Sequence, residues 1–183
     1  MQLRKVAQKI VALSLGAGIL TAGAVAIAPA ATAGSSIAGG TLTSFDSKLL
    51  SLINNVRSAH GLRQLQVAAG TTDVAHGWSC HLATEQSLAH NGALLRELES
   101  HGSRYLNAYD ENVGMSSTST GASWLFKAYM RSPEHRANIL DPAGRYVGIW
   151  TKSNNGFRYN TIDFVGSHST SYSATYGAMR TAC

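Results

Sequence analysis

The chain has 183 residues, with 15 Lys and Arg against 10 Asp and Glu. Three of the basic residues lie in the segment 1–33, which contains no acid, so the segment 34–183 carries 12 basic against 10 acidic side chains. Because that part has no run of Lys or Arg, its charge pattern argues against a nucleic-acid partner. Its length of about 150 residues suits one domain with a substantial core.

The N-terminal segment, 1–33, has the order of a secretory signal. A basic start is followed by an apolar stretch at residues 10–30 and by Ala31-Thr32-Ala33, the small-x-small pattern that signal peptidase favours. An uncleaved membrane anchor is the alternative, since about 20 apolar residues can span a bilayer, but the stretch is rich in Ala and Gly. We therefore expect residues 1–33 to be removed, leaving a secreted, extracellular protein without a membrane span and with a flexible start at residues 34–44.

Apolar residues at helical spacing predict two helices in the first half of the domain. The first helix begins with Ser44 as its cap and ends before Gly61, which suits the left-handed conformation past a last turn. The second helix covers about residues 73–88, with Thr72 as its cap. Three leucines in residues 94–98 indicate a further short helix.

Two more helices are predicted after a Ser/Thr-rich loop at residues 116–121. One covers about residues 122–131, and Trp124 is expected in its buried stripe. The other follows Ser132, a good N-cap residue, and has Pro133 at its first position.

The period of the apolar residues changes near the C-terminus. Residues 146–151 and 157–165 are rich in β-formers, and Asn155-Gly156 between them is a strong hairpin signal. Helices first and an antiparallel hairpin last favour the α+β class over a parallel βαβ sheet.

Common catalytic signatures are absent from the sequence. It contains no H-E-x-x-H, no G-x-S-x-G, no P-loop and no dinucleotide-binding glycine motif. Ser167-His168 does not predict a serine protease, because the sequence offers no evident acid or oxyanion hole to go with it.

The two cysteines, Cys80 and Cys183, are expected to form one disulfide in an oxidising compartment. The alternative is a metal site, because His76, Cys80 and His81 lie at a spacing that shares a helical face. We favour the disulfide, with the two histidines as exposed side chains.

Three further residues are candidates for a functional cleft. His90, Glu111 and His135 each lie at the predicted boundary of an element, where polar groups often converge on a site. Their spacing alone does not show that they meet.

Five segments, in order, resemble the bacterial SCP-like branch of the CAP family (cysteine-rich secretory proteins, antigen 5 and pathogenesis-related proteins). The most specific is Y-M-R-S-P-E-H-R-A-N-I-L, at residues 129–140. The others are L-L-S-L-I-N-N-V-R at 49–57 with its exit at 60–65, A-H-N at 89–91, E-N-V at 111–113, and the hairpin residues 147–149 and 159–164. They span about residues 45–165.

This resemblance implies a three-layer α-β-α sandwich with a central antiparallel sheet over residues 45–183. It also implies a cleft with a tetrad of two His and two Glu, sometimes holding a divalent metal. His90, Glu111 and His135 match three positions of that tetrad.

The fourth tetrad position departs from the family pattern. The second Glu falls three residues after a helix tryptophan, which here is Tyr129, so Ser132 stands at its place. Glu134 replaces a glycine beside the histidine and points in another direction on the helix. The resemblance therefore implies an incomplete or rearranged tetrad.

Two imidazoles and one carboxylate predict weak binding of Zn²⁺ or another divalent cation with an open position. The resemblance implies a monomeric module that binds a lipid, a sterol, or a cell-surface or host partner. A metal-assisted hydrolase or protease is the first alternative, and a structural extracellular protein without a ligand is the second. We favour binding, because the missing Glu removes a general acid/base pair and no nucleophile is evident.

Overall fold

The computed structural model of the chain describes residues 4–5, 42–167 and 183. The predicted cleavage pattern at residues 31–33, most of the segment 34–44, and His168 lie outside the described residues. Within the described part, no helix has the length and apolar character that crossing a bilayer requires.

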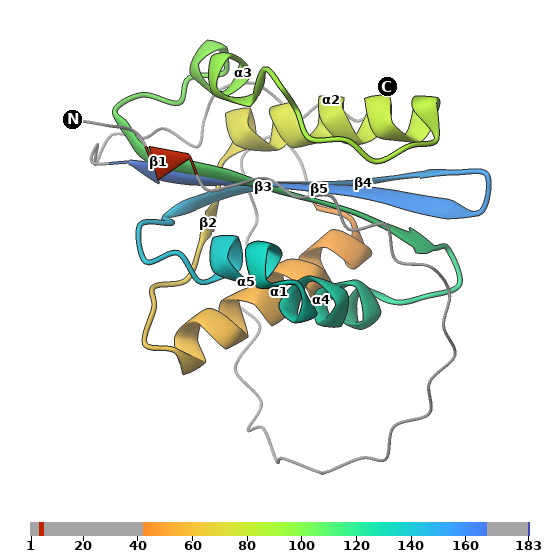
Figure 1. Ribbon diagram of the computed structural model, residues 1–183, viewed down its shortest axis with the longest axis horizontal. Helices are drawn as coiled ribbons and strands as arrows, with labels where there is room; N and C mark the ends of the chain where they lie inside the picture. The colour runs from red at the N-terminus through yellow and green to blue at the C-terminus, as the bar shows by residue number, and fades with distance from the viewer. Residues whose placement is uncertain (1–3, 6–41, 168–182) are drawn as a thin grey trace.

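The elements form three layers, as the sequence resemblance implied (Figure 1). A sheet lies in the middle, and helices cover both of its faces. On one face lie α2 (Ala69–Glu85) and α3 (Leu94–Ser100); on the other lie α1 (Ser44–Ala59), α4 (Ala122–Arg131) and α5 (Pro133–Ile139). The predicted α+β sandwich is confirmed.

The sheet has the strand order β1-β3-β5-β4-β2. Its three long strands are antiparallel: β3 (Leu106–Ser117), β5 (Phe157–Ser167) and β4 (Tyr146–Asn154). Two-residue strands pair in parallel at the edges, β2 (Gln66–Val67) with β4 and β1 (Arg4–Lys5) with β3. The sheet is therefore mixed, with an antiparallel centre.

The edges of the sheet position the site described below. Strand β1 pairs only with Ala108 and Tyr109 of β3. From Asp110 onward, β3 has no further strand beside its outer edge among the described residues. Side chains from both helical layers can therefore approach that edge.

The first helix is confirmed, with a different cap. Thr43, one residue before the predicted Ser44, accepts a hydrogen bond from the Asp46 N–H at 3.1 Å. Gly61 has φ +69°, the left-handed conformation predicted past the helix end.

The second helix is displaced toward the N-terminus. Helix α2 starts after Ala68, so Thr72 lies inside it and donates its hydroxyl to the Ala68 carbonyl at 2.9 Å. The helix ends at Glu85, and Gln86 adopts φ +50°. A threonine hydroxyl can cap a helix, but it can also donate to the carbonyl of the preceding turn from inside a helix. Because Thr72 does the second, the predicted cap is wrong. His90 consequently lies beyond the helix, not at its end.

The predictions for the second half hold better. Helix α4 has the predicted limits, α5 begins at Pro133 as predicted, and the Ser132 side chain caps α5. The hairpin turn is confirmed by φ +47° at Asn155 and φ +78° at Gly156. Trp124, which was predicted to be buried, is 38% exposed.

Strand β3 is the element that the sequence pattern missed. Its middle is polar, reading D-E-N at residues 110–112, so it has no period-2 apolar alternation. These three residues are nevertheless buried, because helices cover both faces of the strand. Glu111 therefore lies within a strand of the sheet, and its predicted place between elements is wrong.

A buried arginine links α1 to the segment between α5 and β4. Arg57 is fully buried and donates hydrogen bonds of 2.8–3.0 Å to four backbone carbonyls. Three of these carbonyls, at Ile139, Asp141 and Gly144, lie between the end of α5 and β4. One side chain therefore fixes the exit of α5 relative to α1.

Candidate functional site

Glu111 and His90 form the centre of the candidate site. One oxygen of the Glu111 carboxylate, Oε1, accepts from His90 Nδ1 at 2.7 Å and from the Asn91 N–H at 2.9 Å. Glu111 is only 1% exposed. Because this bond orients the imidazole through Nδ1, a metal ion would bind His90 through Nε2.

His135 lies in the opposite layer, in the first turn of α5 as predicted. Among the described residues, His90, Glu111 and His135 do not form a group whose ligand atoms all lie within 4.8 Å of one another. The His135 backbone N–H lies 3.5 Å from the capping Ser132 Oγ, and its carbonyl accepts from Asn112 Nδ2 at 3.1 Å. Its ring packs 5.1 Å from the ring of Tyr129. Among the described residues, its buried Nε2 has no hydrogen-bond partner.

The electrostatic surroundings keep the His135 ring neutral. Burial and, to a smaller extent, the charge of His90 lower the pKa of the His135 imidazole, the charge of Glu134 raises it, and the result is a pKa of about 4. A neutral imidazole is the form that binds metal ions.

A pair of asparagines holds α5 against β3 beside Glu111. Asn138 Nδ2 donates to the Glu111 carbonyl at 3.2 Å and to Asn112 Oδ1 at 2.9 Å. His90 thus comes from the segment after α2, His135 comes from α5, and both are positioned relative to the same stretch of β3. Neither asparagine was singled out from the sequence, although Asn138 lies in its most specific segment.

The fourth position of the expected tetrad is occupied by a helix cap. Ser132 Oγ donates to Glu134 Oε2 at 3.2 Å as well as capping α5. Ser132 is buried and Glu134 is half-buried. Glu134 therefore acts on His135 through its charge, while Ser132 brings no charge of its own.

Asp163 is a buried acid beside the site that the sequence analysis missed. It lies directly opposite Glu111 in the pairing of β3 with β5, so both side chains are on the same face of the sheet. Asp163 is fully buried, and neither of its carboxylate oxygens has a partner among the described residues. Burial raises the pKa of Asp163 well above its usual range, and the charges of Glu111 and Glu97 raise it further. The sequence did offer one signal for Asp163, since an acidic residue stood inside the predicted strand 157–165.

A cavity of about 400 Å³ lies beside this cluster. It is lined by residues 91–96, Glu99 and Tyr109. Since the Asn91 N–H contacts Glu111, the cavity adjoins the candidate site. Its lining combines apolar residues with one basic and one acidic residue, Arg96 and Glu99.

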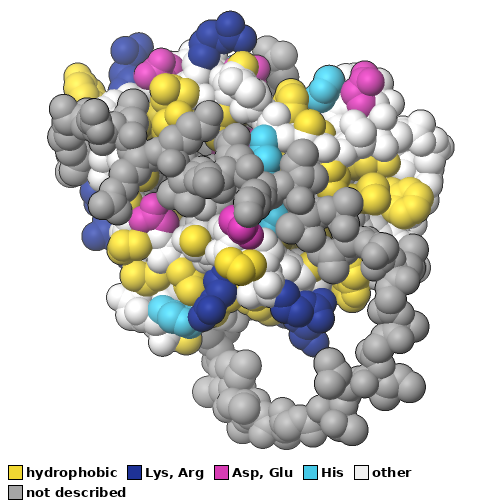
Figure 2. Space-filling model, in the orientation of Figure 1, with side chains coloured by type: hydrophobic (Ala, Val, Ile, Leu, Met, Phe, Trp, Pro, Cys, Tyr) yellow, Lys and Arg dark blue, Asp and Glu magenta, His cyan; other side chains and the backbone are white. Residues whose placement is uncertain are grey.

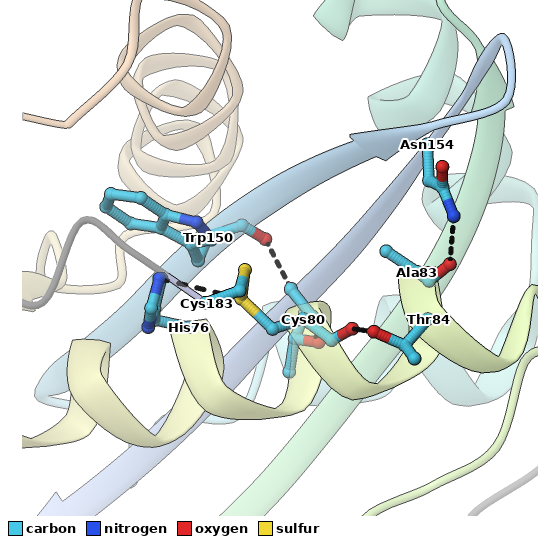
Figure 3. Close-up of a disulfide and its surroundings, with 9 residues drawn as sticks. His76, Cys80, Ala83, Thr84, Trp150, Asn154 and Cys183 are labelled. Carbon is cyan, nitrogen blue, oxygen red and sulfur yellow. Dashed lines mark hydrogen bonds between the residues drawn. A yellow bond between two sulfur atoms is a disulfide. The ribbon is translucent and has the colours of Figure 1, made fainter.

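The predicted disulfide between Cys80 and Cys183 is present, with their Cα atoms 5.7 Å apart (Figure 3). His76 Nε2 lies 3.6 Å from Cys80 Sγ. Contrary to the sequence expectation, His76 is buried, and its ring packs edge-on against Trp150 at 4.8 Å. His81 is exposed and stacks on Trp78.

One group of three potential metal ligands occurs in the described part of the chain: His76, Cys80 and Cys183, whose ligand atoms all lie within 4.8 Å of one another. His81, which the helical spacing had suggested, does not belong to it. In the oxidised protein the two sulfurs are bonded to each other, so they are not available as thiolates.

The fold and the sequence together define the class of protein. Helices on both faces of a sheet with an antiparallel centre are what the resemblance to CAP proteins implied. The sequence model of the cysteine-rich secretory protein family, CAP, matches residues 50–167. The chain therefore belongs to this family. The comparison with curated proteins gave no match.

Solved structures of CAP and SCP proteins share the fold. An extracellular protein with an SCP domain from Bacillus anthracis has a TM-score of 0.59 at 20% identity, over 69% of this chain and 41% of that one. An outer surface protein of Borrelia burgdorferi has a TM-score of 0.58 at 14% identity, over 66% and 90%. The structure of NaASP2 with Zn²⁺ has a TM-score of 0.51 at 13% identity, over 68% and 83%.

Proposed function

We propose that this protein is a secreted CAP-domain binding module whose cleft at the edge of β3 holds a divalent cation weakly and takes an amphipathic ligand beside it. The observation that carries the proposal is the His90–Glu111 pair, together with the buried, unpartnered Nε2 of His135 in a helix that Asn112 and Asn138 hold against the same strand.

The two imidazoles would be the strong ligands of the cation. Glu111 would either complete the set or orient His90 as the carboxylate of a carboxylate–histidine–metal arrangement. Zn²⁺ suits such a set and would keep open positions for water or ligand. Binding is weak because Ser132 does not supply the negative charge of the absent glutamate. That a relative was solved with Zn²⁺ supports this choice of ion.

The adjoining cavity supports a lipid or sterol as the ligand. Leu95 and the ring of Tyr109 offer apolar contact, while Arg96 and Glu99 can bind a polar head group. A cell-surface or host protein is the alternative partner. The extracellular and outer-surface relatives agree with secretion.

A metal-assisted hydrolase is less well supported. Hydrolysis would need a general base beside the metal-bound water. Ser132 stands at the position of the expected second Glu, and Glu134 is engaged by Ser132, so the second carboxylate of an acid/base pair is missing.

The proposal for the metal is tested by calorimetric titration of Zn²⁺ into the oxidised protein. The wild type should bind, and the His90→Ala/His135→Ala double variant should not. His81→Ala is the matched control, because His81 is an exposed histidine outside this site. Equal binding by the wild type and the double variant would place the ion elsewhere. Absence of binding in both would mean that these residues only hold the structure together through hydrogen bonds.

The proposal for the ligand is tested with a fluorescent sterol and a fluorescent fatty acid. One of them should bind the wild type and bind at least about tenfold more weakly to Leu95→Asp, which places a charge in the apolar lining. Leu95 is half-buried, so this change should leave the core intact. If neither probe binds, the cavity is not a lipid site.

A further inference from the structure

His76, Cys80 and Cys183 carry an inference independent of the cleft at β3. His76 and Cys80 are four residues apart in α2, so the helix itself holds both side chains on one face. Cys183, from a distant part of the chain, is placed on them by the disulfide (Figure 3). His76 is buried, Cys80 half-buried and Cys183 exposed, so the group is open on one side.

The distances already match part of a tetrahedral zinc site. With Zn–S bonds of about 2.3 Å and Zn–N bonds of about 2.05 Å, tetrahedral angles place a sulfur and a nitrogen ligand about 3.5 Å apart. His76 Nε2 and Cys80 Sγ are 3.6 Å apart. The helix therefore presents one edge of the tetrahedron without any rearrangement.

Only the second sulfur has to move. Two thiolates on one zinc ion lie about 3.8 Å apart, farther than two bonded sulfurs. Cleavage of the disulfide would let the exposed Cys183 side chain withdraw by that difference, while Cys80 and His76 stay on the helix.

We propose that His76, Cys80 and Cys183 form a second, redox-gated metal site, which binds Zn²⁺ or a similar thiophilic divalent ion when the disulfide is reduced. Two electrons and two protons from a dithiol reductant, itself oxidised to a disulfide, convert the Cys80–Cys183 bond into two thiols. The ion then replaces both thiol protons, which leave to solvent. The His76 proton resides on Nδ1 so that Nε2 can bind. Water takes the fourth position.

Such a site would preserve one structural link in both redox states. The disulfide ties Cys183 to α2 under oxidising conditions, and the ion would tie the same two residues under reducing ones. Oxidation would release the ion. This site shares no residue with His90, Glu111 and His135, so either proposal can fail without the other.

The experiment uses the full chain carrying His90→Ala/His135→Ala, so that the β3 cleft does not contribute. The protein is reduced with a phosphine and titrated with Co²⁺, whose thiolate charge-transfer absorption reports sulfur ligation. The reduced protein should bind one ion with that absorption, and oxidation should abolish it. His76→Gln should weaken binding by at least the roughly 10–100-fold typical of changes around a metal site. His81→Gln, on the same helix, should not.

Two results would overturn the proposal. One is a reduced protein without thiolate absorption. The other is a His76→Gln variant that binds as tightly as its parent, since two cysteines alone would then explain the binding. If reduction unfolds the protein, added Zn²⁺ should restore its circular dichroism spectrum in the parent and not in His76→Gln. Failure of that recovery would also refute the site.

Discussion

His135 combines burial with a titratable ring, and this makes the stability of the protein depend on pH. Its folded pKa of about 4 lies below the ordinary value of 6.5, so folding favours the neutral ring. The stabilising contribution is complete above pH 6.5 and is lost as the pH falls from there toward 4. The full shift corresponds to roughly 3 kcal/mol.

We therefore predict that the free energy of unfolding of the metal-free wild type falls more steeply between pH 6.5 and 4 than that of His135→Gln. Glutamine has no proton to gain in this window. Urea unfolding of both proteins at several pH values measures the difference. Parallel curves would show that His135 is not held neutral in the folded state.

Asp163 has the opposite dependence. Its pKa is raised in the folded protein, so its carboxyl group is best tolerated when protonated, and stability is lost as the pH rises through the folded value. We predict that Asp163→Asn raises the unfolding free energy at pH 8, by about 1–3 kcal/mol, because an amide avoids the cost of burying this carboxyl group at a pH where the unfolded chain ionises it. The amide can also donate to Glu111 Oε2, which has no partner among the described residues.

The gain from Asp163→Asn should disappear near pH 4, where the wild-type carboxyl group is protonated. Urea unfolding at the two pH values provides the test. A variant that is less stable than the wild type at pH 8 would mean that the folded protein uses the Asp163 charge, for instance to bind a cation.

At the scale of elements, α2 packs directly on β4 through backbone contact. A Cβ added to Gly148 of β4 would lie 2.1 Å from the Thr71 carbonyl oxygen and 2.6 Å from the Thr72 nitrogen, both in α2. Neither backbone group can rotate away. The glycine therefore sets the distance between the helix and the sheet.

We predict that Gly148→Ala destabilises the protein by more than about 3 kcal/mol, because the helix must shift off the sheet. Gly77→Ala is the matched control. Gly77 is an exposed position inside α2, and its added Cβ would meet nothing within 4 Å. This second change should stabilise by about 0.5–1 kcal/mol through helix propensity. Thermal unfolding of the metal-free variants measures both, and similar effects would contradict the packing argument.

At the scale of the whole molecule, the Cys80–Cys183 bond closes a loop with a sequence separation of 103 residues. In the chain-entropy model such a loop stabilises the folded state by about 4–5 kcal/mol. We predict a loss of this size in Cys80→Ser/Cys183→Ser, measured by urea unfolding with a chelator present. The wild type in the presence of reductant and chelator is the control and should agree with the variant. A loss below about 1 kcal/mol would mean that the residues between the cysteines already limit the unfolded chain.

The surface charge agrees with the nearly balanced composition of the chain after its N-terminal segment 1–33. In the view of Figure 2, basic side chains form several separate groups with acidic side chains between them. On that face, neither sign of charge covers a broad continuous area among the described side chains.

Local signals in the sequence predicted most elements of the fold. The serine cap and Pro133 of α5, the left-handed Gly61 and the Asn155-Gly156 turn each depend on a few neighbouring residues, so their patterns survive in any tertiary context. The segments that resemble the CAP family predicted, in addition, that the sheet lies between two layers of helices. The Cys80–Cys183 pairing was predicted from having two cysteines in a chain that the sequence led us to expect in an oxidising compartment.

The tertiary structure decided what depends on residues distant in sequence. The polar strand β3 is buried only because helices cover both of its faces, and Asp163 meets Glu111 only through the register of β3 with β5. His76 is buried because the Trp150 ring packs against it. The spacing of apolar residues indicates which secondary structure a segment forms and which of its faces is apolar. It does not report the partners that folding brings from elsewhere, and those partners determine the chemistry of both candidate sites.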